Sequence, residues 1–185
     1  MPRFDLPNAA PEPLRLVQLF VNTASVVEHR VEWLPAPSAL ATWLGEHDPQ
    51  ATGKPTRADL DRALALREAL RALLRSNNTG EDATDAAAVV NEAATRAGLT
   101  LALDEAGELR LEVRAKGVDG ALGRILSVVY GAMLDGSWVR LKVCRKCCWA
   151  FYDPSRNRSG TWCSMQLCGN RTKTRAYRRR KAGTR

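Results

Sequence analysis

The sequence predicts a mainly α-helical α+β protein. A multihelical N-terminal domain with one β-hairpin precedes a small C-terminal four-cysteine zinc module that ends in a basic helix. Apolar residues recur at helical spacing over much of the chain, and two alternating segments flank a short turn near residues 99–114. All five cysteines lie within residues 144–168. We place the domains at residues 1–139 and 140–185.

Spacing of apolar residues predicts the helices of the first domain. Residues 1–13 carry four prolines and are expected to be extended. Ser38 follows Pro37 as the expected N-cap of the second helix. Thr56 and Asp59 stand three residues apart, close to a capping box, at the start of the third. The predicted helices cover residues 14–27, 38–44, 56–76, 82–97 and 118–134.

A β-hairpin is predicted after the fourth helix, where Gly98 is placed to end that helix. Residues 99–103 and 108–114 both alternate apolar and polar side chains, and the turn residues 104–107 lie between them. Residues 139–143 alternate again and are expected to form a short strand that leads into the first cysteine.

Charge is divided unevenly along the chain. Residues 144–185 contain 12 Lys and Arg against one acid, whereas residues 1–143 contain 16 against 19, so a net charge of +8 conceals a strongly basic C-terminal end. Such an end favours a polyanionic partner. There is no run of 18 apolar residues and no basic region followed by an apolar core at the N-terminus, so we expect neither a transmembrane helix nor a signal peptide, and a cytoplasmic location.

The cysteines are spaced as metal ligands. Cys144 and Cys147 are separated by two residues, so both can reach one ion from a tight turn, and Cys163 and Cys168 supply a second pair. Clustered cysteines in a reducing compartment are more often metal ligands than disulfides. We therefore predict one structural Zn²⁺ per chain, with Cys148 as a free thiol.

Basic residues surround this predicted zinc site. Asn170 can cap a helix that runs to residue 181, on which Arg171, Arg175 and Arg178 form one stripe with Arg179 beside it. Such a stripe next to a rigid module suits contacts with nucleic-acid phosphates. A solvated basic tail or a docking surface for an acidic protein are the alternatives.

The motif Cys168-Gly-Asn-Arg171, preceded by residues 162–165 (Trp-Cys-Ser-Met) and 151–157 (Phe-Tyr-Asp-Pro-Ser-Arg-Asn), resembles the CGNR zinc-finger family. Residues 19–23, 43–44 and 65–74 stand where the recurring motifs of the preceding ABATE domain stand, so the resemblance covers essentially the whole chain. It implies a bacterial stress-induced transcription regulator. The family's ligands correspond to the four paired cysteines, and its nucleic-acid contacts correspond to Arg156, Arg158, Arg171 and Lys173.

A DNA-binding regulator is thus the first functional hypothesis, with an N-terminal domain that senses a signal or forms a homodimer. RNA or an acidic protein is the alternative partner. We expect no enzyme, because four thiolates leave zinc no open position and neither His29 nor His47 adjoins a nucleophile. Asn22 and Thr23 could line a pocket for a small effector, or they could brace a helix end.

Overall fold

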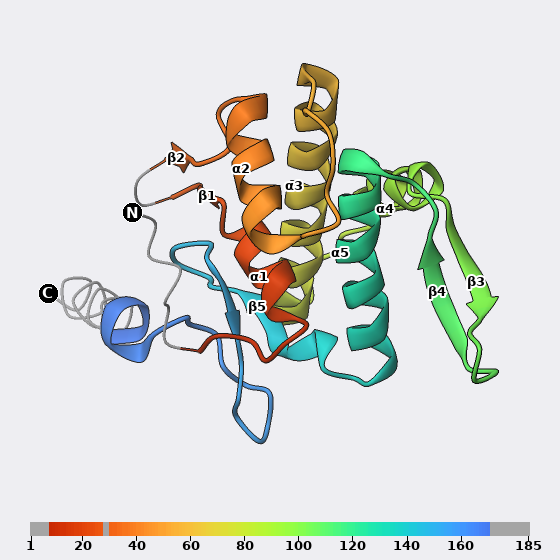
Figure 1. Cartoon of the computed structure of the whole chain (residues 1–185). Coiled ribbons are helices and arrows are strands. Elements are labelled where there is room, and N and C mark those ends of the chain that lie inside the picture. Colours follow the sequence, from red (N-terminus) through yellow and green to blue (C-terminus); the bar gives the residue numbers. More distant parts are fainter. Residues whose placement is uncertain (1–7, 28–29, 171–185) are drawn as a thin grey trace, which may run out of the picture.

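The computed structural model describes residues 8–27 and 30–170 (Figure 1). Its helices are α1 (Arg15–Val21), α2 (Pro37–His47), α3 (Arg57–Thr79), α4 (Asp85–Arg96) and α5 (Gly117–Leu134), with the short helices η1 (Trp138–Arg140) and η2 (Met165–Gly169). Its strands are β1 (Ala24–Ser25), β2 (Val31–Glu32), β3 (Leu99–Leu103), β4 (Leu109–Val113), β5 (Leu141–Val143) and β6 (Ala150–Tyr152). Three antiparallel pairs, β1–β2, β3–β4 and β5–β6, complete the predicted mainly helical α+β fold.

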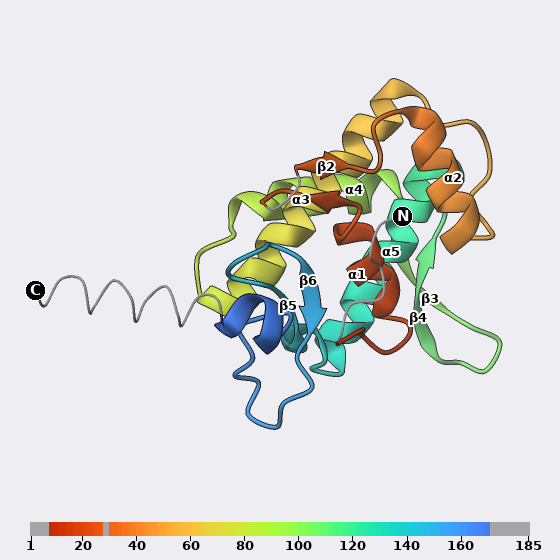
Figure 2. The same ribbon diagram turned by 90° about the vertical axis from the view of Figure 1, so that its left-hand side faces the viewer.

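One apolar core extends from the helices into the cysteine-rich end. Helices α1, α3 and α5 contact one another and supply large buried side chains such as Phe20, Leu70 and Ile125. Leu141 and Ala150, from β5 and β6, belong to the same core. Figure 2 shows this hairpin lying beside α1 and α3, which both contact it. The C-terminal module is therefore built into the body and does not hang from a linker.

Capping residues define both ends of α3, and the predicted capping signal at its start is confirmed. The Thr56 hydroxyl accepts a hydrogen bond from the Asp59 amide while the Asp59 carboxylate accepts one from the Thr56 amide, which is a full capping box. Gly80 ends the helix with a φ of +73°, a left-handed conformation that glycine adopts without a steric penalty. The helix runs to Thr79, three residues beyond its predicted end, and so includes Asn77 and Asn78.

Two predictions about the first helices were wrong. The first helix ends at Val21 and not at residue 27, because the Thr23 side chain donates to the Phe20 carbonyl at 2.8 Å and the chain then turns into β1. The second helix starts at Pro37 after the extended residue Ala36, so Ser38 is not its N-cap. Pro37 occupies the first turn, where its missing amide proton costs no hydrogen bond.

The later elements lie close to their predicted positions. Helix α4 covers residues 85–96 inside the predicted 82–97, and Gly98 follows with a φ of +60°. The β3–β4 hairpin pairs Leu99 with Val113 and Leu103 with Leu109. Before β5, however, the chain passes through the short helix η1, so the predicted strand 139–143 is shortened to its last three residues.

Helix α5 is the one helix of residues 8–27 and 30–170 that is long and apolar enough to cross a membrane. Half of this helix is buried within the protein, and Ile125, Leu126 and Val129 are among its core residues. A buried core helix can satisfy the same criteria of length and apolar composition as a membrane-spanning helix. The sequence-based expectation of no transmembrane helix was drawn from the absence of 18 consecutive apolar residues. Helix α5 contains charged residues, so this criterion did not identify it.

Two predictions concern parts that the structure leaves open. The predicted basic helix after Asn170 lies outside the described residues. The predicted domain division between residues 139 and 140 falls inside η1 and stays a prediction.

Candidate metal centre and the loop beside it

Four cysteines from two separate segments converge on one point. The sulfur atoms of Cys144, Cys147, Cys163 and Cys168 all lie within 4.8 Å of one another, and all four side chains are buried. The Sγ–Sγ distances are 3.4 Å from Cys147 to Cys163 and 3.6 Å from Cys163 to Cys168. Tetrahedral zinc with bonds of about 2.3 Å would hold its sulfur ligands about 3.8 Å apart. The donor set and its spacing therefore fit one Zn²⁺ ion.

Local backbone structure presents each cysteine pair. The first pair lies in the turn between β5 and β6, which is closed by hydrogen bonds from the Cys144 amide to the Trp149 carbonyl and from the Cys148 amide to the Cys144 carbonyl. In the second pair, Cys163 precedes η2 and Cys168 lies within it. Ser164 caps η2 by accepting a hydrogen bond from the Leu167 amide at 3.2 Å.

The protonation of the four thiols also favours a cation. Hydrogen bonds from its neighbours lower the pKa of Cys144, while contact with the Cys144 sulfur raises the pKa of Cys147 and of Cys163, and burial raises the pKa of Cys168. The four sulfur atoms are thus coupled, and they cannot all be thiolates at once without a compensating positive charge. Metal ligation requires thiolates. Zn²⁺ would supply the charge that stabilises them and, with all four positions filled, would act as a structural centre.

A small core of its own surrounds the cysteines. Phe151 is buried among them, and Trp149 and Trp162 pack against the outside of the cluster. Trp149 also contacts Trp33 of the body, with ring centroids 5.7 Å apart. Met165 is 49% exposed, although its sulfur packs so close to Gly169 that a Cβ there would collide with it.

A buried ion pair shapes the loop between the two cysteine pairs. The Lys142 ammonium donates to the Asp153 carboxylate at 2.8 Å and to the carbonyls of Arg158 and Gly160. Asp153 also accepts hydrogen bonds from the backbone amides of Ser155 and Gly160. Burial alone would raise the pKa of Asp153, but these hydrogen bonds outweigh it and lower that pKa to about 2. Asp153 is therefore a carboxylate at neutral pH.

This loop carries two of the predicted nucleic-acid residues. Arg156 and Arg158 are both exposed on it. The loop backbone is held from inside, because Arg140 donates to the carbonyls of Asp153 and Ser155 at 3.1 and 2.8 Å. The exposed side chains thus project from a fixed backbone.

The other predicted nucleic-acid residues are only partly placed. Asn170 is exposed at the end of η2. The remaining five lie outside the described residues: Arg171, Lys173, Arg175, Arg178 and Arg179.

Asn22, predicted to line a small-molecule pocket or to brace a helix end, holds the zinc module to the body. Its side-chain amide donates to the Ala150 carbonyl at 3.0 Å, and its oxygen accepts from the Ala150 amide at 2.8 Å. Gln18 donates to the same carbonyl at 3.1 Å. Asn22 thereby bonds to β6 as a neighbouring strand would. Thr23 is buried and braces the end of α1, as described above, while it accepts a hydrogen bond from Arg67.

Helix α3 holds the other side of the module in the same way. Arg71 donates to the Cys148 carbonyl at 3.0 Å, and Asn78 donates to the carbonyls of Val143 and Thr161 at 2.7 and 3.1 Å. Sequence reasoning missed these residues and treated α3 as an amphipathic helix. The available signal was the recurrence of arginine at positions 67, 71 and 75, four residues apart on one helix face.

Cys148 lies outside the four-sulfur cluster, as predicted. It is 8% exposed, and its sulfur lies 3.4 Å from the Arg75 guanidinium. Its φ is +61°, in the left-handed region that favours glycine.

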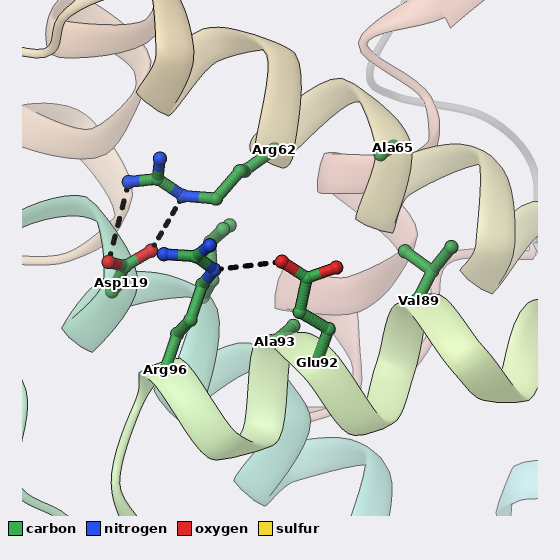
Figure 3. Close-up of a pocket in the computed structure, with 8 residues that line it drawn as sticks. Arg62, Ala65, Val89, Glu92, Ala93, Arg96 and Asp119 are labelled. Carbon is green, nitrogen blue, oxygen red and sulfur yellow. Dashed lines mark hydrogen bonds and ion pairs between the residues drawn. The ribbon is translucent and has the colours of Figure 1, made fainter.

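Two cavities occur away from Asn22. One, of about 40 Å³, lies between α3, α4 and α5 (Figure 3). Both arginines that line it already form ion pairs, because Arg62 donates to Asp119 at 3.0 Å and Arg96 donates to Glu92 at 3.0 Å. The other, of about 400 Å³, lies between residues 11–14 and the second half of α5. An effector pocket at Asn22 and Thr23 stays a prediction.

The histidines give no catalytic arrangement in the described part of the chain. The ring of His47 stacks on Trp43 at 4.4 Å, and its Nδ1 lies 2.8 Å from the Trp43 carbonyl. His29 lies outside the described residues. The expectation of a non-enzymatic protein stays a prediction.

Comparison with known families gives two matches that divide the chain between them. The profile of the ABATE family, described as "Putative stress-induced transcription regulator", matches residues 14–135. The profile of the CGNR zinc finger matches residues 140–181 and so contains all four converging cysteines. A search of curated proteins found no match.

Proposed function

Because the chain belongs to the ABATE family and carries a CGNR zinc finger, we propose that it is a cytoplasmic transcription regulator that binds DNA through this finger. The N-terminal body senses a signal or forms a homodimer. Zinc holds the finger together and takes no part in catalysis, since four thiolates leave no position for water or substrate.

The observation that carries the proposal is the loop beside the metal centre. Arg156 and Arg158 are exposed there, on a backbone that Arg140 and the buried Lys142–Asp153 pair hold from inside. A backbone that is ordered before binding loses little entropy when its side chains contact phosphates. Arginine forms bidentate hydrogen bonds with phosphate, and such contacts fix a protein on the duplex.

The test is binding of the full zinc-loaded chain to labelled duplex DNA, followed by fluorescence anisotropy over a range of salt concentrations. For Arg156→Ala/Arg158→Ala we expect weaker binding and a shallower dependence of log K on log salt. Each lost phosphate contact lowers the slope by roughly 0.9 on B-DNA. A matched control is Arg57→Ala/Arg96→Ala, which removes two exposed arginines from α3 and α4 of the body. The control should bind DNA as the wild type does.

The same titration with single-stranded RNA separates the alternatives. Tighter binding to RNA than to DNA would replace DNA with RNA as the partner, since unpaired bases can stack on exposed aromatic and arginine side chains. If the chain binds neither duplex DNA nor single-stranded RNA at low salt, its basic C-terminal end would be a docking surface for an acidic protein. An equal loss in the control variant would show a general charge effect and would remove the assigned role of the loop.

A further inference from the structure

The β3–β4 hairpin exposes more apolar surface than any other strand pair of residues 8–27 and 30–170. Its register places six apolar residues on one face: Leu99, Leu101, Leu103, Leu109, Leu111 and Val113. The base of this face is covered, because Val113 packs against α5 at Gly123. The outer half is open, with Leu101, Leu103 and Leu109 exposed by 58%, 70% and 63%. Figure 1 shows this outer half projecting beyond the helices.

The edge of β4 that faces away from β3 offers hydrogen-bonding groups as well. Within the described ranges β4 pairs with β3 alone. The Asp104 amide donates to the Glu108 carbonyl at 2.9 Å, so position 108 bonds toward β3. Because antiparallel strands alternate, Arg110 and Glu112 also bond toward β3. The amides and carbonyls of Leu109, Leu111 and Val113 therefore point to the unpaired edge. An edge of this kind is a template for another strand.

The charges of β4 are complementary to a second copy of the same strand. Glu108, Arg110, Glu112 and Arg114 alternate in sign. If two copies pair antiparallel around Leu111, Arg110 faces Glu112 of the partner subunit. Glu108 likewise faces Arg114 of the partner subunit. Each pair occurs twice by symmetry, and the same register joins the free backbone groups of the two edges.

Neighbouring registers are less favourable. Centring the pair on position 110 or 112 places like charges opposite each other, which is destabilising. Centring it on Leu109 or Val113 keeps fewer opposite-charge pairs. The edge of β3 carries no charged residue between Leu99 and Leu103. Self-pairing of β4 around Leu111 is therefore the arrangement that charge and hydrogen bonding select together.

We propose that the protein forms a homodimer through antiparallel pairing of β4 with β4 of a second copy. The two hairpins then make one four-stranded sheet, and their apolar faces become continuous. The interface is isologous, so both copies contribute the same residues. The present contacts of Arg110 with Asp104 and of Arg114 with Glu112 are made by exposed arginines and contribute little that would oppose the exchange.

The experiment measures the molar mass of the full zinc-loaded chain by sedimentation equilibrium over a range of concentrations, without nucleic acid. Arg110→Glu and Glu112→Arg each place two like-charge pairs in the interface, and we expect each to raise the dimer Kd about tenfold. The double variant Arg110→Glu/Glu112→Arg restores opposite charges at both contacts. We expect it to recover wild-type dimerisation.

The two single variants change the net charge in opposite directions, so a non-specific charge effect would move their Kd values apart, whereas the proposed register raises both. All substituted side chains are exposed, and circular dichroism checks that each variant is folded. A wild-type chain that stays monomeric at 100 µM and above would overturn the proposal. A dimer whose Kd is the same in the wild type and in all three variants would also overturn it. Because no DNA is present, failure here leaves the proposed function of the finger standing.

Discussion

Two hairpins of the same molecule have opposite surroundings. The strands of the β5–β6 hairpin are buried except for the half-buried Tyr152, and side chains from α1 and α3 bond to the backbone of the hairpin. The β3–β4 hairpin is anchored at its base and open along its outer half, and neither of its edges pairs with a third strand of the described residues. Covered edges fix the position of the cysteines and of the basic loop, while an open edge remains available to another strand. One hairpin thus orders the interior of the protein, and the other can associate with a second chain.

The largest effect is expected from removing the metal. Cys144→Ser/Cys163→Ser should abolish zinc retention and unfold the covered hairpin, because zinc contributes roughly 10 kcal/mol or more to the folding of small zinc modules. Elemental analysis and hydrogen exchange measure the two losses. The β3–β4 hairpin should keep its protection. Cys148→Ser is the matched control and should retain one zinc per chain; loss of zinc there would place Cys148 among the ligands.

The next effect concerns the ion pair inside the covered module. Asp153→Asn leaves the Lys142 charge buried without a counter-charge and should lower the free energy of unfolding by about 3 kcal/mol. Chemical denaturation at pH 7 measures it. The surface variant Asp61→Asn, in an exposed pair, is the control and should change stability by less than about 1 kcal/mol.

The pH dependence of this effect has a definite sign. The pKa of Asp153 is lowered to about 2 in the folded protein, so its contribution is present above its unfolded pKa near 4 and is lost as the pH falls from about 4 to about 2. The stability difference between wild type and Asp153→Asn should therefore be constant from pH 8 to pH 5. A difference that changes within this range would contradict the assigned pKa.

A smaller effect is expected from the bonds that join the body to β6. Asn22→Ala leaves the buried amide and carbonyl of Ala150 without this partner and should cost about 2 kcal/mol. Hydrogen exchange should quicken at β6 and not at β3–β4. Asn157→Ala, on the exposed loop, is the control and should leave both stability and exchange unchanged. Equal exchange at β6 in wild type and Asn22→Ala would show that Asn22 does not hold the strand.

The smallest effect on stability is expected at the open hairpin. Leu103→Thr/Leu109→Thr replaces two exposed side chains and should change the free energy of unfolding by less than about 0.5 kcal/mol per site, measured under conditions where the chain is monomeric. Leu99→Thr, at the base that packs against the core, is the contrast and should cost more than 1 kcal/mol. Similar costs at both positions would remove the distinction between base and outer half.

Local patterns predicted the elements that depend on local chemistry. The cysteine spacing identified the four sulfur atoms that converge, the Thr56 and Asp59 pair predicted the start of α3, and strict alternation located the β3–β4 hairpin. Each of these signals lies within a few residues of the structure that it specifies.

Long-range polar contacts could not be predicted in this way. Asn22 and Ala150 are 128 residues apart, and nothing near either one indicates that a side-chain amide will take the place of a strand. The Lys142–Asp153 pair was also missed, because a lysine within an alternating apolar strand reads as an outward-facing residue. The end of α1 was placed too late for a related reason: the Thr23 side chain bonds backward to Phe20 and also meets Arg67 from α3.

The hydrogen bonds of Asn22 also set an order of events during synthesis. Gln18 and Asn22 leave the ribosome early, but the Ala150 backbone that they bind is made more than a hundred residues later. Until then their side-chain amides remain hydrated, and α1 lacks its contact with β6. The body therefore acquires this part of its packing only after β6 has been made, late in the synthesis of the chain.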